Sequence, residues 1–297
     1  MNKVDSFTKM EHKDGGIAYS AMICLYIFIV FIGQAVLNAF VKSQSTISIA
    51  ISALFSPLAM LAVIAYYRIF KRGNLTELTG VKKFNTVSLL PSILLAMGML
   101  FGLGFVNGIF INALKSLGCY VSEFVLAFNG VGDLVVYLIV LALVPAIVEE
   151  AFFRGLMLNA LKGAKPIVAV ICTSLCFALY HCSASQLVYQ IIYGAGLALL
   201  AIYAKSTIPC MVAHFINNAM VILLEYFKVQ LDLMNIISIV CGIICLAVFM
   251  IIIVKNLKKY HTYDEKDGTI SKFFVPFGLF GVIICSLMII LNLIPVA

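Results

Sequence analysis

Six charged or polar residues stand inside strongly apolar stretches of this sequence, at spacings that suit chemistry. They are Glu149, Glu150, Arg154, His181, His214 and Asn218. A charged side chain at bilayer depth costs about 2.5–3.5 kcal/mol on insertion scales, so such residues are candidates for function by default. The other two histidines, His12 and His261, stand in charged loops and are expected to be solvated.

These residue types together could hydrolyse a peptide bond. A buried carboxylate beside a histidine can hold and deprotonate a water molecule, then return the proton to a leaving amine. A second histidine and an asparagine amide can donate to a carbonyl oxygen as it becomes an oxyanion. An Arg154–Glu150 pair would keep one acid charged and leave Glu149 free as the base. The alternative is a set of hydrogen bonds that only holds helices together.

The composition shows where these residues must work. Of 297 residues, 63% are hydrophobic and 11% are charged, and the mean hydropathy is +1.12. A soluble domain has about 45–50% apolar and about 25% charged residues. The chain is therefore a polytopic membrane protein. Its nine cysteines show no CxxC spacing and lie mostly in apolar runs, so they predict no disulfide or zinc framework.

The apolar runs predict an all-α transmembrane helix bundle with about nine spans, with eight as the alternative. They cover residues 16–40, 46–69, 88–114, 132–161, 166–182, 186–204, 208–227, 233–254 and 273–294. The loops are too short to be domains, so one membrane domain is expected. Within it, the polar residues lie in the segment 132–227, between amino-terminal helices (1–131) and carboxy-terminal helices (228–297).

Basic residues predict the orientation of the bundle. Sixteen Lys and Arg lie in loops on one side of these runs, against three, Lys42, Lys115 and Lys228, on the other. By the positive-inside rule the amino terminus is cytoplasmic and the carboxyl terminus is outside, in a multi-pass protein of the cell membrane. The net charge of +7 reflects this orientation and predicts no nucleic-acid partner.

Helix geometry brings the candidate residues together. Glu149 lies about 12 residues, or roughly 18 Å, before the turn at 162–165, and His181 lies about 15 residues, or roughly 22 Å, beyond it. In an antiparallel hairpin these depths agree to within one helical turn. His214 enters from the same side, one to two turns into its own run. Three helices can therefore direct all the polar groups at one buried cavity.

The same residues carry a family resemblance. Glu149-Glu150-x-x-x-Arg154, Phe177-x-x-x-His181 and His214-x-x-x-Asn218 resemble, in order and spacing, the three motifs of the CPBP (CAAX protease and bacteriocin-processing enzyme) family, also called Abi. The resemblance covers roughly residues 130–227. It implies an intramembrane endopeptidase acting on lipidated CAAX-like or bacteriocin-type peptides, with Glu149 and His181 activating water and His214 and Asn218 forming the oxyanion site.

Metal use and two rival functions stay open at this point. If a divalent metal such as zinc is bound, its ligands would be Glu149, His181 and His214. There is no HExxH motif, and the same residues suffice for a glutamate-based mechanism, so we favour catalysis without a tightly bound metal. A proton-coupled transporter would also bury such residues. A non-catalytic membrane scaffold or bacteriocin immunity protein could retain them as structure.

Overall fold

The computed structural model describes residues 10–41, 45–121, 126–229, 236–257, 269–274 and 277–294, and in these ranges every regular element is helical. Seven helices in them are long and apolar enough to cross a membrane. Two shorter apolar helices, α10 (Pro166–Tyr180) and α15 (Phe277–Asn292), occupy the places of the fifth and ninth predicted runs. The predicted all-α bundle is confirmed.

Several spans consist of more than one helical element. The first span is the single helix α1 (His12–Phe40). The second consists of α2 (Thr46–Ala53) and α3 (Phe55–Ile69), and the short α4 (Leu75–Thr79) follows it. The third combines η1 (Thr86–Ser88), α5 (Leu89–Met97), η2 (Gly98–Leu103) and α6 (Gly104–Ser116). The fourth combines α7 (Val131–Tyr137), η3 (Leu138–Leu143), α8 (Val144–Glu150), η4 (Ala151–Met157) and α9 (Leu158–Ala160). The rest are α11 (Ala184–Ala204), α12 (Ile208–Tyr226), α13 (Ile236–Leu257) and the short α14 (Thr269–Phe274).

The outer surface of the bundle is apolar. Large side chains such as Phe31, Phe40 and Ile236 are 78%, 84% and 80% exposed. Soluble monomers rarely expose contiguous apolar patches of more than a few hundred Å². Lipid is the environment that such a surface requires, so the chain is an integral, multi-pass membrane protein.

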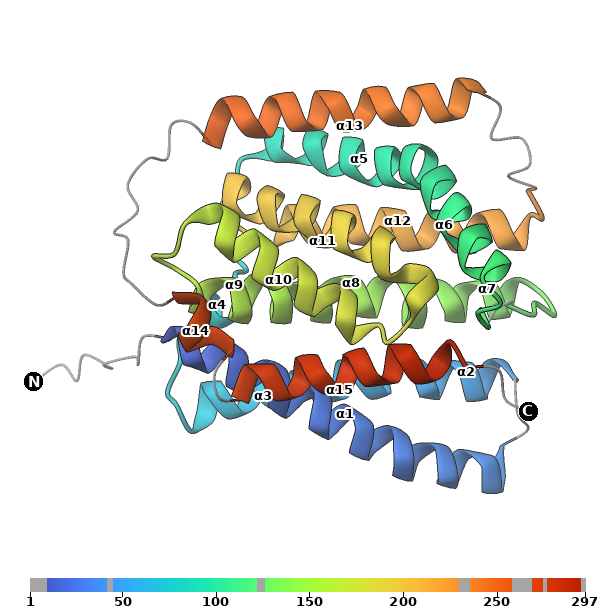
Figure 1. The fold of residues 1–297 in the computed structure, drawn as a ribbon, viewed down its shortest axis with the longest axis horizontal. Helices are drawn as coiled ribbons and strands as arrows, with labels where there is room; N and C mark the ends of the chain where they lie inside the picture. The colour runs from blue at the N-terminus through green and yellow to red at the C-terminus, as the bar shows by residue number, and fades with distance from the viewer. Residues whose placement is uncertain are drawn as a thin grey trace, which may run out of the picture.

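The helices form three layers (Figure 1). The first contains α1, α3 and α15, and the third contains α5 and α13. The fourth span, α10, α11 and α12 lie between them. The contact of α13 with η2 is very close, because a Cβ added to Gly242 would lie 2.2 Å from the Gly102 nitrogen. The predicted site segment is therefore the middle layer.

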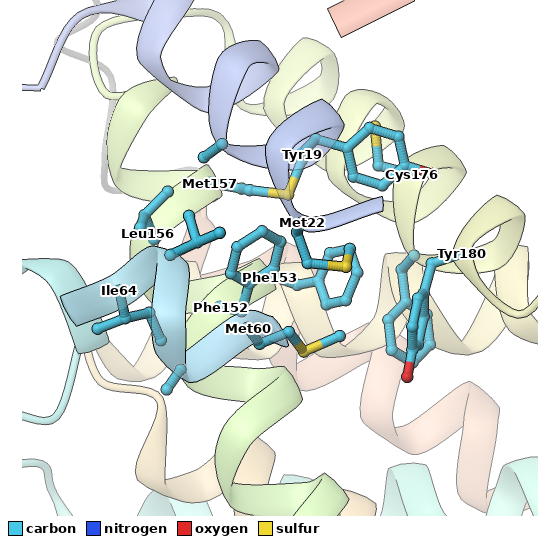
Figure 2. Close-up of a cluster of buried hydrophobic side chains, with 14 of the residues drawn as sticks. Tyr19, Met22, Met60, Ile64, Phe152, Phe153, Leu156, Met157, Cys176 and Tyr180 are labelled. Atoms are coloured by element: carbon cyan, nitrogen blue, oxygen red, sulfur yellow. The ribbon is translucent and has the colours of Figure 1, made fainter. Parts of the chain in front are cut away.

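The fourth span is the centre of the hydrophobic core. All ten residues from Val148 to Met157 are buried, as expected for a helix surrounded by protein rather than lipid. Figure 2 shows Phe152 and Phe153 of this span packed among side chains of its neighbours. Those neighbours are α1 (Tyr19, Met22), α3 (Met60, Ile64) and α10 (Cys176, Tyr180). The two acids thus lie in a ten-residue stretch of the fourth span that is wholly buried.

Two π-helical turns, η3 and η4, flank the acid pair. Pro145 follows η3 and has no N–H for the Leu141 carbonyl four residues earlier. The sequence predicts a kink at this proline, and a π turn is a recognised cause of one. The second turn, η4, begins directly after Glu150 and contains Arg154. Such turns are common at functional sites.

The loops predicted to be cytoplasmic meet at one end of the bundle, the end where α1 begins and where α4, α9 and α14 lie (Figure 1). Here His12 Nδ1 lies 2.7 Å from the Ala160 carbonyl. His12 is therefore half-buried and engaged with the protein, so the expectation that it is solvated is wrong. The following residues used to predict orientation and exposure lie outside the described ranges: Lys3, Lys9, Lys42, Lys258, Lys259, Lys266 and His261.

Candidate active site

Glu150 is the centre of a buried polar cluster. Its Oε1 accepts hydrogen bonds from Arg154 Nη1 at 2.9 Å and from His214 Nδ1 at 2.8 Å. All three side chains are at most 5% exposed. A buried ion pair is retained only when hydrogen bonds satisfy its members, and here one carboxylate oxygen receives both donors. This fixes His214 on α12 against the fourth span.

Arg154 is held by three different groups. Besides Glu150, it donates from Nη2 to the Gly194 carbonyl of α11 at 3.1 Å. Its guanidinium carbon lies 4.3 Å from the ring centre of Phe177 on α10, a geometry that attracts a desolvated cation. The i, i+4 spacing predicted the ion pair with Glu150 within the fourth span. The contacts of Arg154 with α10 and α11, which connect three helices, were not predicted.

Glu149 has one engaged and one unengaged oxygen. Its Oε1 lies 3.2 Å from the Tyr180 hydroxyl, which in turn lies 2.7 Å from Ser56 Oγ. A hydroxyl has one hydrogen, so when Tyr180 donates to Glu149 it accepts from Ser56. Glu149 Oε2 is buried without a hydrogen-bond partner in the described part of the chain, 4.0 Å from His214 Nε2. Glu150 Oε2 is likewise buried without a partner there, so each acid has one engaged and one unengaged oxygen.

His181 stands at the carboxyl end of α10, where it caps the helix. Its Nδ1 lies 2.8 Å from the Phe177 carbonyl. A carbonyl only accepts, so Nδ1 carries the hydrogen and Nε2 presents a lone pair. The ring also meets those of Phe177 and Tyr180 edge-on, each at 4.9 Å between centres. Tyr180 therefore contacts both His181 and Glu149.

Asn218 lies one turn beyond His214 on α12. Its Nδ2 donates to the Leu141 carbonyl at 3.2 Å. This is the carbonyl that Pro145 leaves without its helical partner, so the asparagine compensates for the proline across the helix interface. One amide hydrogen of Asn218 is used in this way, and the second has no acceptor among the bonds of the described residues.

The neighbouring Asn217 has a different set of partners. Its Oδ1 accepts from Tyr189 of α11 at 2.7 Å, and its Nδ2 donates to Asn218 Oδ1 at 3.4 Å. Asn217 is 5% exposed, so both bonds are made inside the protein. The two asparagines thus face different helices, as their one-residue separation predicts.

Sequence reasoning brought the right helices together but missed several members of the site. Glu149, Glu150, Arg154 and His214 are in direct contact, and His181 joins them through Tyr180 and Phe177. The missed contributors are Ser56, Tyr180, Tyr189 and the backbone carbonyl of Gly194. The one available signal was the tyrosine directly before His181, because a phenol in an apolar run needs a hydrogen-bond partner. Ser56 and Gly194 gave no signal, since they act through contacts made by folding.

The residues named as possible metal ligands do not form a metal site in this structure. No group of three His, Cys, Asp or Glu in the described ranges is arranged to hold an ion. His214 Nδ1 is engaged with Glu150, and Tyr180 occupies one oxygen of Glu149. Holding an ion would require these contacts to rearrange, so no step below uses one.

One comparison with known proteins bears on this site. Residues 131–220 match a family described as Type II CAAX prenyl endopeptidase Rce1-like. The matched range runs from α7 into α12 and includes all six predicted site residues. No curated protein and no solved structure matches the chain. The family match supports an intramembrane endopeptidase with peptide substrates.

The three motifs and the family match cover the same helices. The arrangement of the acid pair on the fourth span, His181 on α10 and His214 on α12 is the arrangement that the motif order had predicted. Residues 131–220 are therefore similar to the Rce1-like type II CAAX prenyl endopeptidase family, in agreement with the resemblance of the three motifs to the CPBP intramembrane proteases.

Proposed function

We propose that the chain is a cell-membrane endopeptidase that hydrolyses membrane-associated peptides, of lipidated CAAX-like or bacteriocin type, with water activated by Glu149 and His181. Residues 132–227 form the catalytic core, and the helices of 1–131 and 228–297 enclose it. The amino terminus lies in the cytoplasm. The family match supports the reaction class, and the site geometry supports the roles.

The observation that carries the proposal is the contrast between the two adjacent acids. The donors from Arg154 and His214 both go to Glu150 Oε1, whereas Glu149 Oε1 has only the Tyr180 hydroxyl. The Oε2 atoms of both acids are buried without a partner in the described structure, and that of Glu149 belongs to the acid that has no ion pair with Arg154. Two carboxylates stand side by side in the cluster, and the guanidinium of Arg154 is paired with only one of them, Glu150. Glu149 is thus the base.

The proposed reaction uses two atoms that have no hydrogen-bond partner among the described residues. Glu149 Oε2 and the lone pair of His181 Nε2 accept the two hydrogens of a water molecule. The water oxygen attacks the carbonyl carbon of the scissile peptide bond while its proton moves to Glu149. The carbon–nitrogen bond breaks as Glu149 returns this proton to the leaving nitrogen. The products are a carboxylic acid and an amine, and Glu149 is again a carboxylate.

The oxyanion is stabilised from α12. The bond to the Leu141 carbonyl holds Asn218 in place. Its second amide hydrogen can then donate a hydrogen bond to the negatively charged oxygen. His214 lies one turn away and adds a second donor when its Nε2 is protonated. Because both side chains are already held in place, little reorganisation is needed in the transition state.

A direct test is peptide cleavage by the purified protein in detergent. We expect new peptide termini with the wild-type protein and none with Glu149→Ala. Comparing membrane peptides from cells that express either form identifies the substrate. A proton-coupled transporter or a non-catalytic scaffold would give no cleavage with either form, and that result would overturn the proposal.

Metal removal tests the mechanism separately. If Glu149 and His181 act on water without a metal, activity should survive dialysis against a strong chelator, and added zinc should not increase it. Native mass spectrometry should then show no stoichiometric metal. Loss of activity on dialysis with recovery on adding zinc would replace this mechanism by a metal-dependent one and leave the protease assignment intact.

A further inference from the structure

A cavity of about 470 Å³ lies at the end of the bundle where the basic loops gather. Its walls come from α4 and the chain after it, the η4–α9 end of the fourth span, the start of α10, the end of α11 and the turn before α12. A hydrogen bond from Thr207 N to the Gly80 carbonyl joins two of these walls. Of the polar cluster described above, only Arg154 lines it, whereas Glu149, His181 and Asn218 do not. The cavity is therefore distinct from the proposed water-activating groups and borders their cluster at Arg154.

The charged groups of this cavity are mostly positive. Lys82, Lys162 and Lys205 line it, together with one acid, Glu77. Glu77 lies 2.6 Å from the Lys82 ammonium and 3.7 Å from that of Lys162. The hydrogen bond from Lys82 lowers the pKa of the Glu77 carboxyl, so this acid stays charged at neutral pH. The three lysines still exceed it by two positive charges.

The amino termini of two helices add to the positive charge of the cavity. Pro166, the first residue of α10, and Thr207, the N-cap of α12, both line the cavity. Each helix dipole contributes about half a positive charge at that end, which favours an anion nearby. Pro166 and Pro209 have no N–H, so the helix ends act here through the dipole rather than through a row of donors. The helices have 15 and 19 residues, so both dipoles are fully developed.

A buried cation stands at the inner wall. Arg154 lines the cavity and is 3% exposed. Its Nη atoms are engaged in the active-site cluster, but its Nε is buried without a hydrogen-bond partner in the described structure. The lysines, the helix ends and this unsatisfied donor all favour an anion.

Much of the remaining lining is apolar, and α10, which forms part of the wall, carries exposed apolar side chains. Leu158, Ala169, Ala201 and Ile202 form part of the wall. On α10, Ile167 and Ile171 are 61% and 48% exposed on the outer surface. The cavity also lies at the ends of four membrane helices, the level at which phospholipid headgroups are found. A ligand with an anionic head and apolar chains matches this combination better than a soluble anion.

We propose that this cavity binds the phosphate headgroup of an anionic phospholipid, with Lys82, Lys162 and Lys205 around the phosphate and the acyl chains along α10. Basic pockets between membrane helices on the cytoplasmic side bind such headgroups in general. The site does not depend on the catalytic mechanism.

Lipid binding is measured on the full-length protein in a neutral detergent by native mass spectrometry, with phosphatidylglycerol, phosphatidylcholine or inorganic phosphate added. We expect one tightly bound phosphatidylglycerol. The triple variant Lys82→Gln/Lys162→Gln/Lys205→Gln should bind it at least about 10-fold more weakly. Lys162→Gln alone, at an exposed side chain, should weaken it about 5-fold and keeps the test valid if the triple variant does not fold.

The matched control is Lys13→Gln/Lys71→Gln/Lys83→Gln, which removes the same charge from exposed lysines at the same end of the bundle. It should bind phosphatidylglycerol like the wild-type protein. An equal loss in this control, or equal binding of phosphatidylcholine, would overturn the site. Lysine-dependent binding of inorganic phosphate without binding of phosphatidylglycerol would overturn the lipid assignment in favour of a soluble phosphate compound.

Discussion

Replacing Glu149 by glutamine should lower the rate of peptide cleavage by about 10⁴-fold while the protein stays folded. Glutamine keeps the volume of the side chain, and its carbonyl oxygen can still accept from Tyr180, so the packing around it is preserved. The amide cannot accept the proton of water. The measurement is single-turnover cleavage in detergent, with thermal unfolding as the check on folding.

The double variant Glu149→Gln/His181→Ala tests whether the two residues act on the same water molecule. Both residues are proposed to hold the same water molecule, so the double variant should be little worse than either single one. If the two defects multiply, the residues do not act as a unit and the water has another base. Glu225→Gln, which changes an exposed acid at the end of α12, is the matched control and should leave the rate unchanged.

Much of this site could be predicted because helix geometry is nearly invariant. The spacing of Glu150 and Arg154 predicted their pair, which the structure shows at 2.9 Å. The depth estimates for Glu149 and His181 required only a rise of 1.5 Å per residue and an antiparallel hairpin. Apolar runs of about 20 residues gave the spans, since the bilayer sets their length.

The partner of His214 could not be predicted in this way. Sequence spacing places its imidazole near both acids but does not give the rotation of α12 about its own axis. In the structure Nδ1 is bonded to Glu150, while Nε2 is 4.0 Å from Glu149. That choice decides which acid is neutralised and which is free. It depends on side-chain packing between helices that are far apart in the sequence.

The π turns were also beyond sequence reasoning. Proline at position 145 predicted an irregular fourth span, but hydropathy periodicity does not distinguish a widened turn from a simple kink. The consequence appears on another helix, because the Leu141 carbonyl is satisfied by Asn218 of α12. Asn218 therefore has two roles, one structural and one proposed in catalysis, and its substitution must be designed to separate them.

Substituting the two asparagines of α12 separates these roles. Asn218→Ala should lower kcat by about 10²–10³ with little change in KM, the usual loss for one oxyanion donor. Asn217→Ala instead leaves the half-buried Tyr189 hydroxyl without its acceptor, which costs about 1–3 kcal/mol of stability. Its unfolding temperature should therefore fall, while kcat changes less than tenfold.

Stability measurements complete the comparison of the two asparagines. Asn218→Ala leaves the Leu141 carbonyl without its side-chain donor, which also costs about 1–3 kcal/mol. The two variants should therefore lose similar stability, although kcat falls far more in Asn218→Ala. Equal kcat defects in the two variants, each in proportion to its loss of stability, would mean that Asn218 only supports the helix interface. The oxyanion would then need another donor, and His214 is the candidate, because it lies one turn away on the same helix.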